Sequence, residues 1–344
     1  MSYKILYIED LDGNSVKNNL ERCDIEVMIN NASGFDETLN DIEKTFDAYI
    51  MDFRLDAKTG RVNAPTFAST IRGFAKDKHQ CPIILVSNEV NLVQYDKDFT
   101  CHDLFDMVIR KDAFLQHHLK YCERIKDSIE AYKHIKGNNF DINSTLNINN
   151  EEDYILDYRL ISKLNDAKKN KDIYSFYRTI YQTLIRGIGL LIGEDILAAR
   201  FGVDKESENY SDFISIFDDC KYTGIMSSSY HRWWAHRVIA KWKEIADFSL
   251  RRLQAADRVE ILRKHFALSL RPAEPLDMAT STTFWTICAN TKRPLDPSEG
   301  FIFREKDLEV WQEQEYISLH SALTNPKLRK FLSPGDNKEL LQYE

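Results

Sequence analysis

Short apolar runs alternate with longer amphipathic stretches over the first third of the chain, and this alternation limits the folds open to it. Five runs are typical of β-strands, at residues 4–8, 25–29, 48–51, 82–86 and 107–109. Helical patterns lie between and after them, at residues 14–21, 35–44, 64–76 and 114–136. Strands that alternate with helices indicate βαβ units and a mainly parallel sheet. We therefore predict an α/β domain over residues 1–136, with a doubly wound, five-stranded parallel sheet.

Polar residues follow the predicted strands at the points where the strands end. Glu9 and Asp10 follow the first strand, Asp52 the third and Ser87 the fourth, and Lys111 stands near the end of the fifth. The carboxyl ends of parallel strands line up along one edge of the sheet, where ligands bind. We therefore expect these five side chains to meet in one crevice.

The chemistry of this set points to phosphoryl transfer. Three carboxylates in a small space repel one another unless a hard cation neutralises them, and Mg²⁺ with oxygen ligands suits that role. A carboxylate can attack a phosphoryl group when a metal ion and a fixed cation stabilise the charge on the transferring oxygens. Lys111 can supply the fixed charge, and the Ser87 hydroxyl can donate a hydrogen bond to a phosphoryl oxygen.

Four segments, KILYIED, AYIMDFRL, PIILVSNE and MVIRKDAF, carry this set in the order found in receiver domains of two-component response regulators. The N-terminal region resembles that CheY-like, flavodoxin-like family. The resemblance implies that Asp52 accepts a phosphoryl group from a histidine kinase or phosphotransfer protein, with help from Ser87 and Lys111. The Mg²⁺ ligands that it implies are Glu9, Asp10, Asp52 and the backbone carbonyl of Arg54. The alternative is a flavodoxin-like fold with incidental polar strand ends.

The sequence departs from the receiver pattern at several positions. Asp112 stands where receivers usually have proline, Val108 where an aromatic switch residue is common, and Asn88 where a small residue is usual. The loop at residues 54–63 is also longer and more charged than usual. These departures weaken the aromatic-switch mechanism more than phosphorylation itself. We predict that phosphorylation orders the 54–63 loop and residues 87–90 instead.

The rest of the chain has a different pattern. Residues 137–152 are polar and asparagine-rich without helical periodicity, so we expect a linker there. Residues 153–344 resemble no common response-regulator output domain and are expected to form a mainly helical output or interaction domain. Its expected helices cover residues 154–167, 173–192, 194–201, 231–248, 250–268 and 308–323. A small hairpin is expected from residues 284–288 and 300–304.

Residues 230–272 are locally basic, with seven Arg and three Lys against two Asp and two Glu, an excess of six positive charges. Together with Trp233, Trp234 and Trp242 they could form a nucleic-acid surface, because cations and aromatic rings grip phosphates and stack on bases. We favour the other interpretation, a helical pair whose tryptophans are core. The net charge of −8 over the whole chain also disfavours nucleic-acid binding.

Three other patterns have simpler explanations than a functional site. The glycine-rich residues 186–193 have no preceding strand and no Lys-Ser/Thr pair, so helix packing is favoured over a phosphate loop. Residues 196–203 resemble the start of a helix-turn-helix, but acidic residues follow them, so we expect an ordinary helix end at Gly202. Neither Cys288 with His320 nor the histidine pair at 231 and 236 forms a convincing nucleophile or metal motif.

Bulk properties complete the interpretation. No stretch approaches the roughly 20 apolar residues that a membrane span needs, and the N-terminus has no secretory pattern, so a cytoplasmic protein is expected. The cysteines are expected to be reduced and structural. They are Cys23, Cys81, Cys101, Cys122, Cys220 and Cys288.

The leading hypothesis is a signalling protein whose receiver relays phosphorylation to a C-terminal module that contacts another protein. Its expected chemistry is phosphotransfer and slow self-hydrolysis, so it is not expected to be a conventional enzyme. A homodimer stays open, and a membrane partner is not expected. The rivals are a DNA-binding transcriptional regulator and a receiver-gated effector of a stress or phage-defence system.

Overall fold

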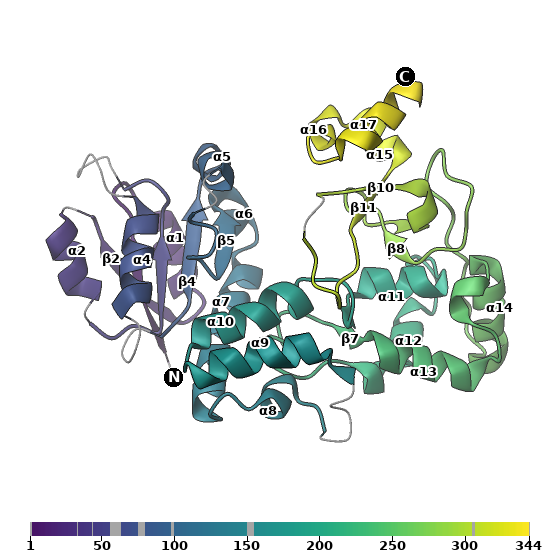
Figure 1. The fold of residues 1–344 in the computed structure, drawn as a ribbon, viewed down its shortest axis with the longest axis horizontal. Helices are drawn as coiled ribbons and strands as arrows, with labels where there is room; N and C mark the ends of the chain where they lie inside the picture. Colours follow the sequence, from purple (N-terminus) through teal and green to yellow (C-terminus); the bar gives the residue numbers. More distant parts are fainter. Residues whose placement is uncertain are drawn as a thin grey trace. The chain divides into compact units, whose positions relative to one another are not determined.

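The computed structural model describes residues 2–32, 34–42, 44–55, 63–74, 80–97, 100–149, 155–304 and 307–343. It forms two compact units (Figure 1). The N-terminal unit contains Met1–Thr179 and Gly224–Ser229, and the C-terminal unit contains Ile180–Thr223 and Tyr230–Glu344. The division at Thr179 differs from the linker that we expected at residues 137–152.

The N-terminal unit is built on a five-stranded sheet in which every pair of neighbouring strands is parallel. The strands are β1 (Tyr3–Ile8), β2 (Ile25–Asn30), β3 (Ala48–Met51), β4 (Ile83–Ser87) and β5 (Met107–Arg110). Their order is β2-β1-β3-β4-β5. This is the flavodoxin-like order of a doubly wound fold. The predicted fold class is therefore confirmed.

Helices flank this sheet (Figure 1). They are α1 (Asn14–Glu21), α2 (Phe35–Ile42), α4 (Ala64–Phe74), α5 (Glu89–Lys97), α6 (Lys111–Gln116) and α7 (His118–Gly137). On one face, Phe67 and Ile71 of α4 join Leu6 and Leu85 of the strands in one apolar cluster. Alternate strand residues such as Ile84 point to the other face and are equally buried. Both faces are covered, as a parallel sheet requires.

Three more helices belong to the same unit: α8 (Ile142–Leu146), α9 (Tyr158–Lys169) and α10 (Ile173–Ile180). The first of them lies inside the segment that we expected to be a linker. Asp141 caps it, because its carboxylate accepts a hydrogen bond from the backbone N–H of Ser144 at 2.7 Å. Phe140 and Leu146 on either side are buried. The Asp141 cap and the burial of two apolar side chains thus stabilise a helix in a segment whose composition is mostly polar.

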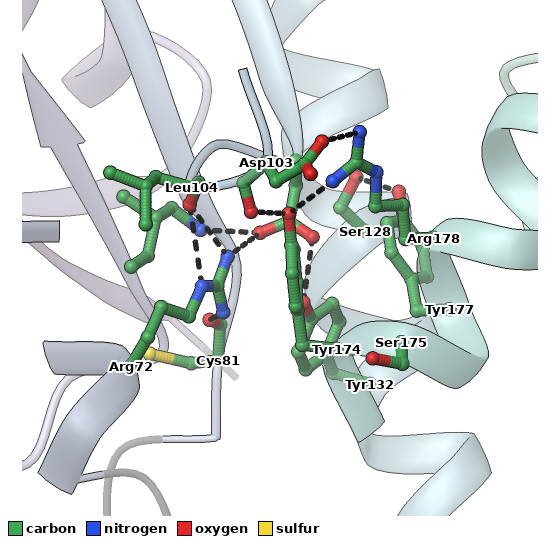
Figure 2. Close-up of polar contacts among 12 residues, drawn as sticks. Arg72, Cys81, Asp103, Leu104, Ser128, Tyr132, Tyr174, Ser175, Tyr177 and Arg178 are labelled. Carbon is green, nitrogen blue, oxygen red and sulfur yellow. Dashed lines mark hydrogen bonds and ion pairs between the residues drawn. The ribbon is translucent and has the colours of Figure 1, made fainter. Parts of the chain in front are cut away.

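A buried ion pair at the amino edge of the sheet joins the strands to the helices (Figure 2). Asp106, just before β5, accepts hydrogen bonds from Arg72 Nη2 at 2.6 Å, the Ile83 N–H at 2.8 Å and the Tyr132 hydroxyl at 2.7 Å. The Arg72 guanidinium also lies 3.8 Å from the centre of the Tyr174 ring of α10. The Arg72 charge is thus balanced by the Asp106 carboxylate, and the Ile83 N–H and the Tyr132 hydroxyl each have an acceptor.

The same edge holds α10 by further contacts (Figure 2). The Tyr174 hydroxyl donates to the backbone carbonyl of Asp103, and Arg178 Nη2 lies 2.5 Å from the Asp103 carboxylate. Arg72 donates to the carbonyls of Leu104 and Cys81. These contacts explain why a helix far along the sequence belongs to the N-terminal unit.

The C-terminal unit is mainly helical, with short two-stranded pieces. Its α-helices are α11 (Glu194–Phe201), α12 (Tyr210–Ser215), α13 (Ala235–Ile245), α14 (Ala255–Phe266), α15 (Leu319–Thr324), α16 (Pro326–Arg329) and α17 (Pro334–Leu340). Its strand pairs are β6 (Leu191–Ile192) with β7 (Trp233–Trp234), β8 (Thr286–Ile287) with β9 (Pro294–Leu295), and β10 (Gly300–Ile302) with β11 (Tyr316–Ser318). Single turns of 3₁₀- or π-helix cover Tyr181–Ile185, Asp218–Cys220, Leu250–Arg252, Pro297–Glu299 and Leu341–Tyr343.

The tryptophans of the basic tract lie in the core of this unit. Trp233 and Trp242 pack in one apolar cluster with Phe201, and Trp234 is equally buried. Gly202 ends α11 with a positive φ of 66°, and a Cβ there would lie 2.5 Å from the Cβ of Ala255. The expected helix end at this glycine is therefore confirmed, and its tight packing requires the absence of a side chain.

Three local expectations beyond the sheet are wrong. Residues 173–192 are not one helix, because α10 ends at Ile180, a π-helical turn covers Tyr181–Ile185 and β6 follows at Leu191–Ile192. Residues 284–288 and 300–304 do not pair, because β8 turns directly back into β9 and β10 pairs with β11. Residues 308–323 are not one helix, since only α15 within them is helical. Gln312 instead bridges Gly189, and the Glu313 N–H donates to the Ile188 carbonyl at 2.7 Å. Backbone pairing with a distant segment thus overrides the local helical pattern.

Candidate functional site

The carboxyl ends of β1 and β3 bring three carboxylates together. One oxygen each from Glu9, Asp10 and Asp52 lies within 4.8 Å of the others, and all three residues are buried. The parallel pairing of β1 with β3, which sets Ile8 opposite Met51, places the residues after both strands side by side. In the part of the chain that the structure describes, this is the only such group of three metal-ligating side chains.

Glu9 is held by donors on both of its oxygens. Oε2 accepts hydrogen bonds from the Tyr7 hydroxyl and from Lys111 Nζ, each at 2.7 Å, and Oε1 accepts one from the Leu11 N–H at 3.2 Å. The ion pair with Lys111 compensates one of the three negative charges. Asp52 makes no direct ion pair with a cation among the described residues, although the Lys111 charge acts on it from nearby.

Tyr7 is a site residue that the sequence analysis missed. Burial, and then the charge of the Glu9 carboxylate, raise the pKa of its hydroxyl, which therefore stays a hydrogen-bond donor. Gly13 makes room for the ring, since a Cβ there would lie 2.9 Å from Tyr7 Cε1. The available signal was the spacing, because residues two apart on a strand point to the same side.

Asp52 sits in an environment that disfavours its charged form. Its pKa is raised from the ordinary 3.8 to about 6, mainly by burial and further by the nearby Glu9 charge. The Ser87 hydroxyl, the Phe53 N–H and the charge of Lys111 partly oppose this rise. The Phe53 N–H donates to Oδ1 at 2.8 Å. A bound cation would lower this pKa, because it favours the ionised carboxylate.

Ser87 lies at the carboxyl end of β4 and is fully buried. Its hydroxyl is close enough to Asp52 to lower the pKa of that carboxyl, yet it makes no hydrogen bond of regular geometry to any described residue. A buried hydroxyl without a regular partner is costly, and an added acceptor at this position would remove that cost.

The unusual residues around the site have structural roles. The Asn88 carboxamide oxygen accepts a hydrogen bond from the Asn91 N–H at 2.9 Å and so caps α5. Asp112, in the first turn of α6, accepts one from Arg110 Nε at 2.6 Å. Val108 is 37% exposed, and because valine has no ring it cannot act as an aromatic switch.

Arg54 connects the site to α5. Its guanidinium donates to the Gln94 side-chain oxygen at 2.9 and 3.2 Å, and its backbone forms an antiparallel bridge with Asn63. Residues 56–62, the centre of the loop that we predict to respond to phosphorylation, lie outside the described residues.

The donor set fits a hard divalent cation. All three candidate ligands are carboxylate oxygens, which Mg²⁺ prefers, and the described ion pair of Lys111 in this cluster is with Glu9. Because Glu9 already accepts three hydrogen bonds, Asp10 and Asp52 are the better candidates for direct ligands.

The patterns that we set aside in the C-terminal region do not assemble into a second site. Trp233, Trp234 and Trp242 are about 1% exposed and cannot stack on bases. Cys288 is buried against Ser321, while His320 lies 3.8 Å from the Asp277 carboxylate and is not among the thiol's described hydrogen-bond partners.

No helix among the described residues is long and apolar enough to cross a bilayer.

Comparisons with known proteins bear on the N-terminal fold. No protein-family model matches the sequence, and no curated protein matches it. Many solved CheY-like receiver domains match over roughly 37% of the chain. The strand order of the sheet is itself the flavodoxin-like one.

Three of the matching structures show the extent of the likeness. A receiver domain protein of Clostridium thermocellum is 18% identical over 38% of this chain and 97% of its own, with a TM-score of 0.31. The response regulator TrrA of Thermotoga maritima, in complex with Mg²⁺–BeF, is 20% identical over 36% of this chain and 99% of its own, with a TM-score of 0.28. An adenylate cyclase of Rhodopirellula baltica is 16% identical over 40% and 95%, with a TM-score of 0.31.

Proposed function

We propose that this chain is a response regulator that accepts a phosphoryl group on Asp52 and relays the signal through its C-terminal unit to a protein partner. The observation that carries the proposal is the convergence at the carboxyl edge of the sheet. Three buried carboxylates, Lys111 and the buried Ser87 hydroxyl come together there from separate strands. The phosphodonor would be a histidine kinase or a phosphotransfer protein.

The residues divide the work of the transfer. Because Phe53 holds Oδ1 of Asp52, the other oxygen, Oδ2, is the nucleophile. Its lone pair forms the new O–P bond while the N–P bond of the donor phosphohistidine breaks, and the leaving imidazole nitrogen takes a proton from solvent. The product is an acyl phosphate on Asp52, which water later hydrolyses to inorganic phosphate and the free carboxylate.

Two side chains would stabilise the transferred group. The Lys111 side chain is flexible and partly exposed, so its ammonium group can turn from Glu9 toward a phosphoryl oxygen. The Ser87 hydroxyl gains in that oxygen the regular acceptor that it lacks. Mg²⁺ bound by Asp10, Asp52 and the Arg54 carbonyl would neutralise the carboxylates and the charge on the phosphoryl oxygens.

A protein partner is favoured over DNA as the target of the C-terminal unit. The helix that could have opened a helix-turn-helix, α11, has Ile196–Phe201 buried and ends at Gly202. The tryptophans of the basic tract are core residues. Neither feature offers the exposed reading helix or stacking surface that nucleic-acid recognition uses.

Phosphorylation of the intact chain tests the proposal. A small phosphodonor such as acetyl phosphate, with Mg²⁺, should add one phosphoryl group, detected by intact mass and lost on treatment with hydroxylamine. Asp52→Asn should remove the labelling. Asp12→Asn, a change to an exposed carboxylate near the site, should leave it intact. Equal labelling of Asp52→Asn and wild type would falsify the assignment.

A further inference from the structure

A small pocket in the C-terminal unit is separate from the receiver chemistry. Its volume is about 320 Å³, and its walls include Arg251, Trp285, Thr286, Glu313 and Tyr316. This volume is at the lower end of the range for small-molecule sites. The pocket can therefore hold a metabolite-sized group but not a folded partner.

Two arginines lie against the indole of Trp285 at this pocket. The guanidinium carbon of Arg200 is 4.3 Å from the ring centre and that of Arg251 is 5.1 Å from it. Arg200 is already paired, because its Nη2 donates to both oxygens of Glu313 at 2.7 and 2.8 Å. Arg251 makes no hydrogen bond or ion pair with any residue that the structure describes. The carboxylate of Glu313 is thus already engaged by Arg200, and no described residue pairs with Arg251.

A third arginine adds to the positive charge near Arg200. Arg258 is fully buried, and its Nη1 donates to the carbonyls of Arg200 and Phe284, each at 2.8 Å. Its Nε and Nη2 have no hydrogen-bond partner among the described residues, and burial lowers its pKa to about 10. Asp296, which opposes that shift, accepts hydrogen bonds from Thr283 and other hydroxyls and makes no ion pair with Arg258.

The pocket wall also presents a hydroxyl without a partner. Thr286 is 2% exposed, and its Oγ1 makes no hydrogen bond to a described residue. A buried hydroxyl normally has an acceptor or donor, so its absence here suggests that a ligand supplies one. Arg251 and Thr286 together offer a full charge and a neutral donor, which is the combination that an oxyanion takes up.

We propose that this pocket binds a small oxyanion, the carboxylate or phosphate group of a metabolite-sized ligand. Arg251 pairs with its charge, Thr286 donates a hydrogen bond to one of its oxygens, and the edge of Trp285 contacts its apolar part. The bound charge offsets the repulsion between Arg200 and Arg251, which Glu313 alone does not balance. The C-terminal unit would then have a ligand of its own, independent of phosphorylation on Asp52.

Calorimetric titration of the intact chain tests this site, with inorganic phosphate and acetate as separate probes. The titrations are done at fixed ionic strength without Mg²⁺, and chloride serves as the reference anion. Saturable binding of one or both probes is expected, and the stronger one identifies the oxyanion class. Arg251→Gln should weaken it roughly tenfold or more, because a charge-assisted hydrogen bond is lost. Arg252→Gln, a neighbouring exposed arginine, should change it less than about twofold.

Two further variants separate this site from the receiver. Lys111→Gln should leave the tighter binding unchanged, because the pocket is in the other unit, and Thr286→Val should weaken it several-fold while keeping side-chain volume. The proposal is overturned if neither probe binds saturably. It is also overturned if Arg251→Gln and Arg252→Gln behave alike, or if Lys111→Gln abolishes the binding.

Discussion

The two edges of the N-terminal sheet both bury carboxylates, but they treat them in opposite ways. At the amino edge, Asp106 accepts hydrogen bonds from Arg72, Ile83 and Tyr132, so its charge is paired and its lone pairs are used. At the carboxyl edge, Lys111 pairs with Glu9 whereas Asp52 makes no ion pair among the described residues, and burial raises the pKa of Asp52 to about 6. The first arrangement stabilises a fold, whereas the second keeps unbalanced charge where a ligand can use it.

The largest expected effect comes from removing Asp106 from its hydrogen-bonded cluster at the amino edge. Asp106→Ala leaves the Arg72 charge buried beside Tyr174 without its partner, and we expect a loss of about 3–5 kcal/mol in the free energy of unfolding. Urea denaturation of the intact chain, followed by the circular dichroism of the sheet unit, measures it. The double change Arg72→Met with Asp106→Leu removes both charges and should cost clearly less. If the single and double changes cost the same, the pair is not the source of the stability.

The carboxyl edge should lose stability as the pH rises. The pKa of Asp52 is raised in the folded state from 3.8 to about 6, so the folded state binds its proton more tightly than the unfolded state does. Stability linked to Asp52 is therefore complete below pH 4 and falls as the pH rises through 6. Relative to Asp52→Asn, the wild type should lose up to about 3 kcal/mol over this window without Mg²⁺.

Denaturation at several pH values measures this difference. Asp12→Asn is the control, since that carboxylate is exposed and lies outside the cluster, and its stability difference from wild type should stay nearly flat. If the unfolding free energies of Asp52→Asn and wild type change in parallel between pH 4 and pH 7, the pKa of Asp52 is not raised in the folded protein.

Mg²⁺ should relieve the same imbalance. At a concentration about ten times its dissociation constant, it should stabilise the wild type by about 1.4 kcal/mol. Asp10→Asn should remove this Mg²⁺ dependence, and it should also make the metal-free protein slightly more stable because one repulsive charge is gone. Melting temperatures with and without Mg²⁺ measure both effects. An Asp10→Asn protein that still gains stability from Mg²⁺ would exclude Asp10 as a ligand.

The features of these two edges that the sequence predicts are those that local patterns mark, and contacts between distant residues are not among them. The β-strands and the acids at their ends follow from local patterns, so the position of Glu9, Asp10 and Asp52 along one edge was predictable. The partners of Asp106 were not, because Arg72 and Tyr132 come from distant helices and no local pattern marks their meeting. For the same reason α15 replaced a longer predicted helix, since the backbone pairing that competes with helix formation lies more than a hundred residues away.

The smallest expected effect concerns Tyr7, a neutral residue beside the charged cluster at the carboxyl edge. Its hydroxyl donates to Glu9 Oε2 together with Lys111, so it is a neutral side-chain donor that partly satisfies the charged cluster. Tyr7→Phe keeps the ring against Gly13 and removes only that hydrogen bond, so it should cost about 1 kcal/mol of unfolding free energy. It should also leave the charge of the Glu9 carboxylate less compensated, and Mg²⁺ should bind about as well as before or a few-fold more tightly. Denaturation and Mg²⁺ titration of Tyr7→Phe, with Tyr3→Phe at the start of β1 as control, measure both quantities. A loss above about 2 kcal/mol together with weaker Mg²⁺ binding would mean that Tyr7 helps to build the metal site, and the two edges would then differ less than their charges suggest.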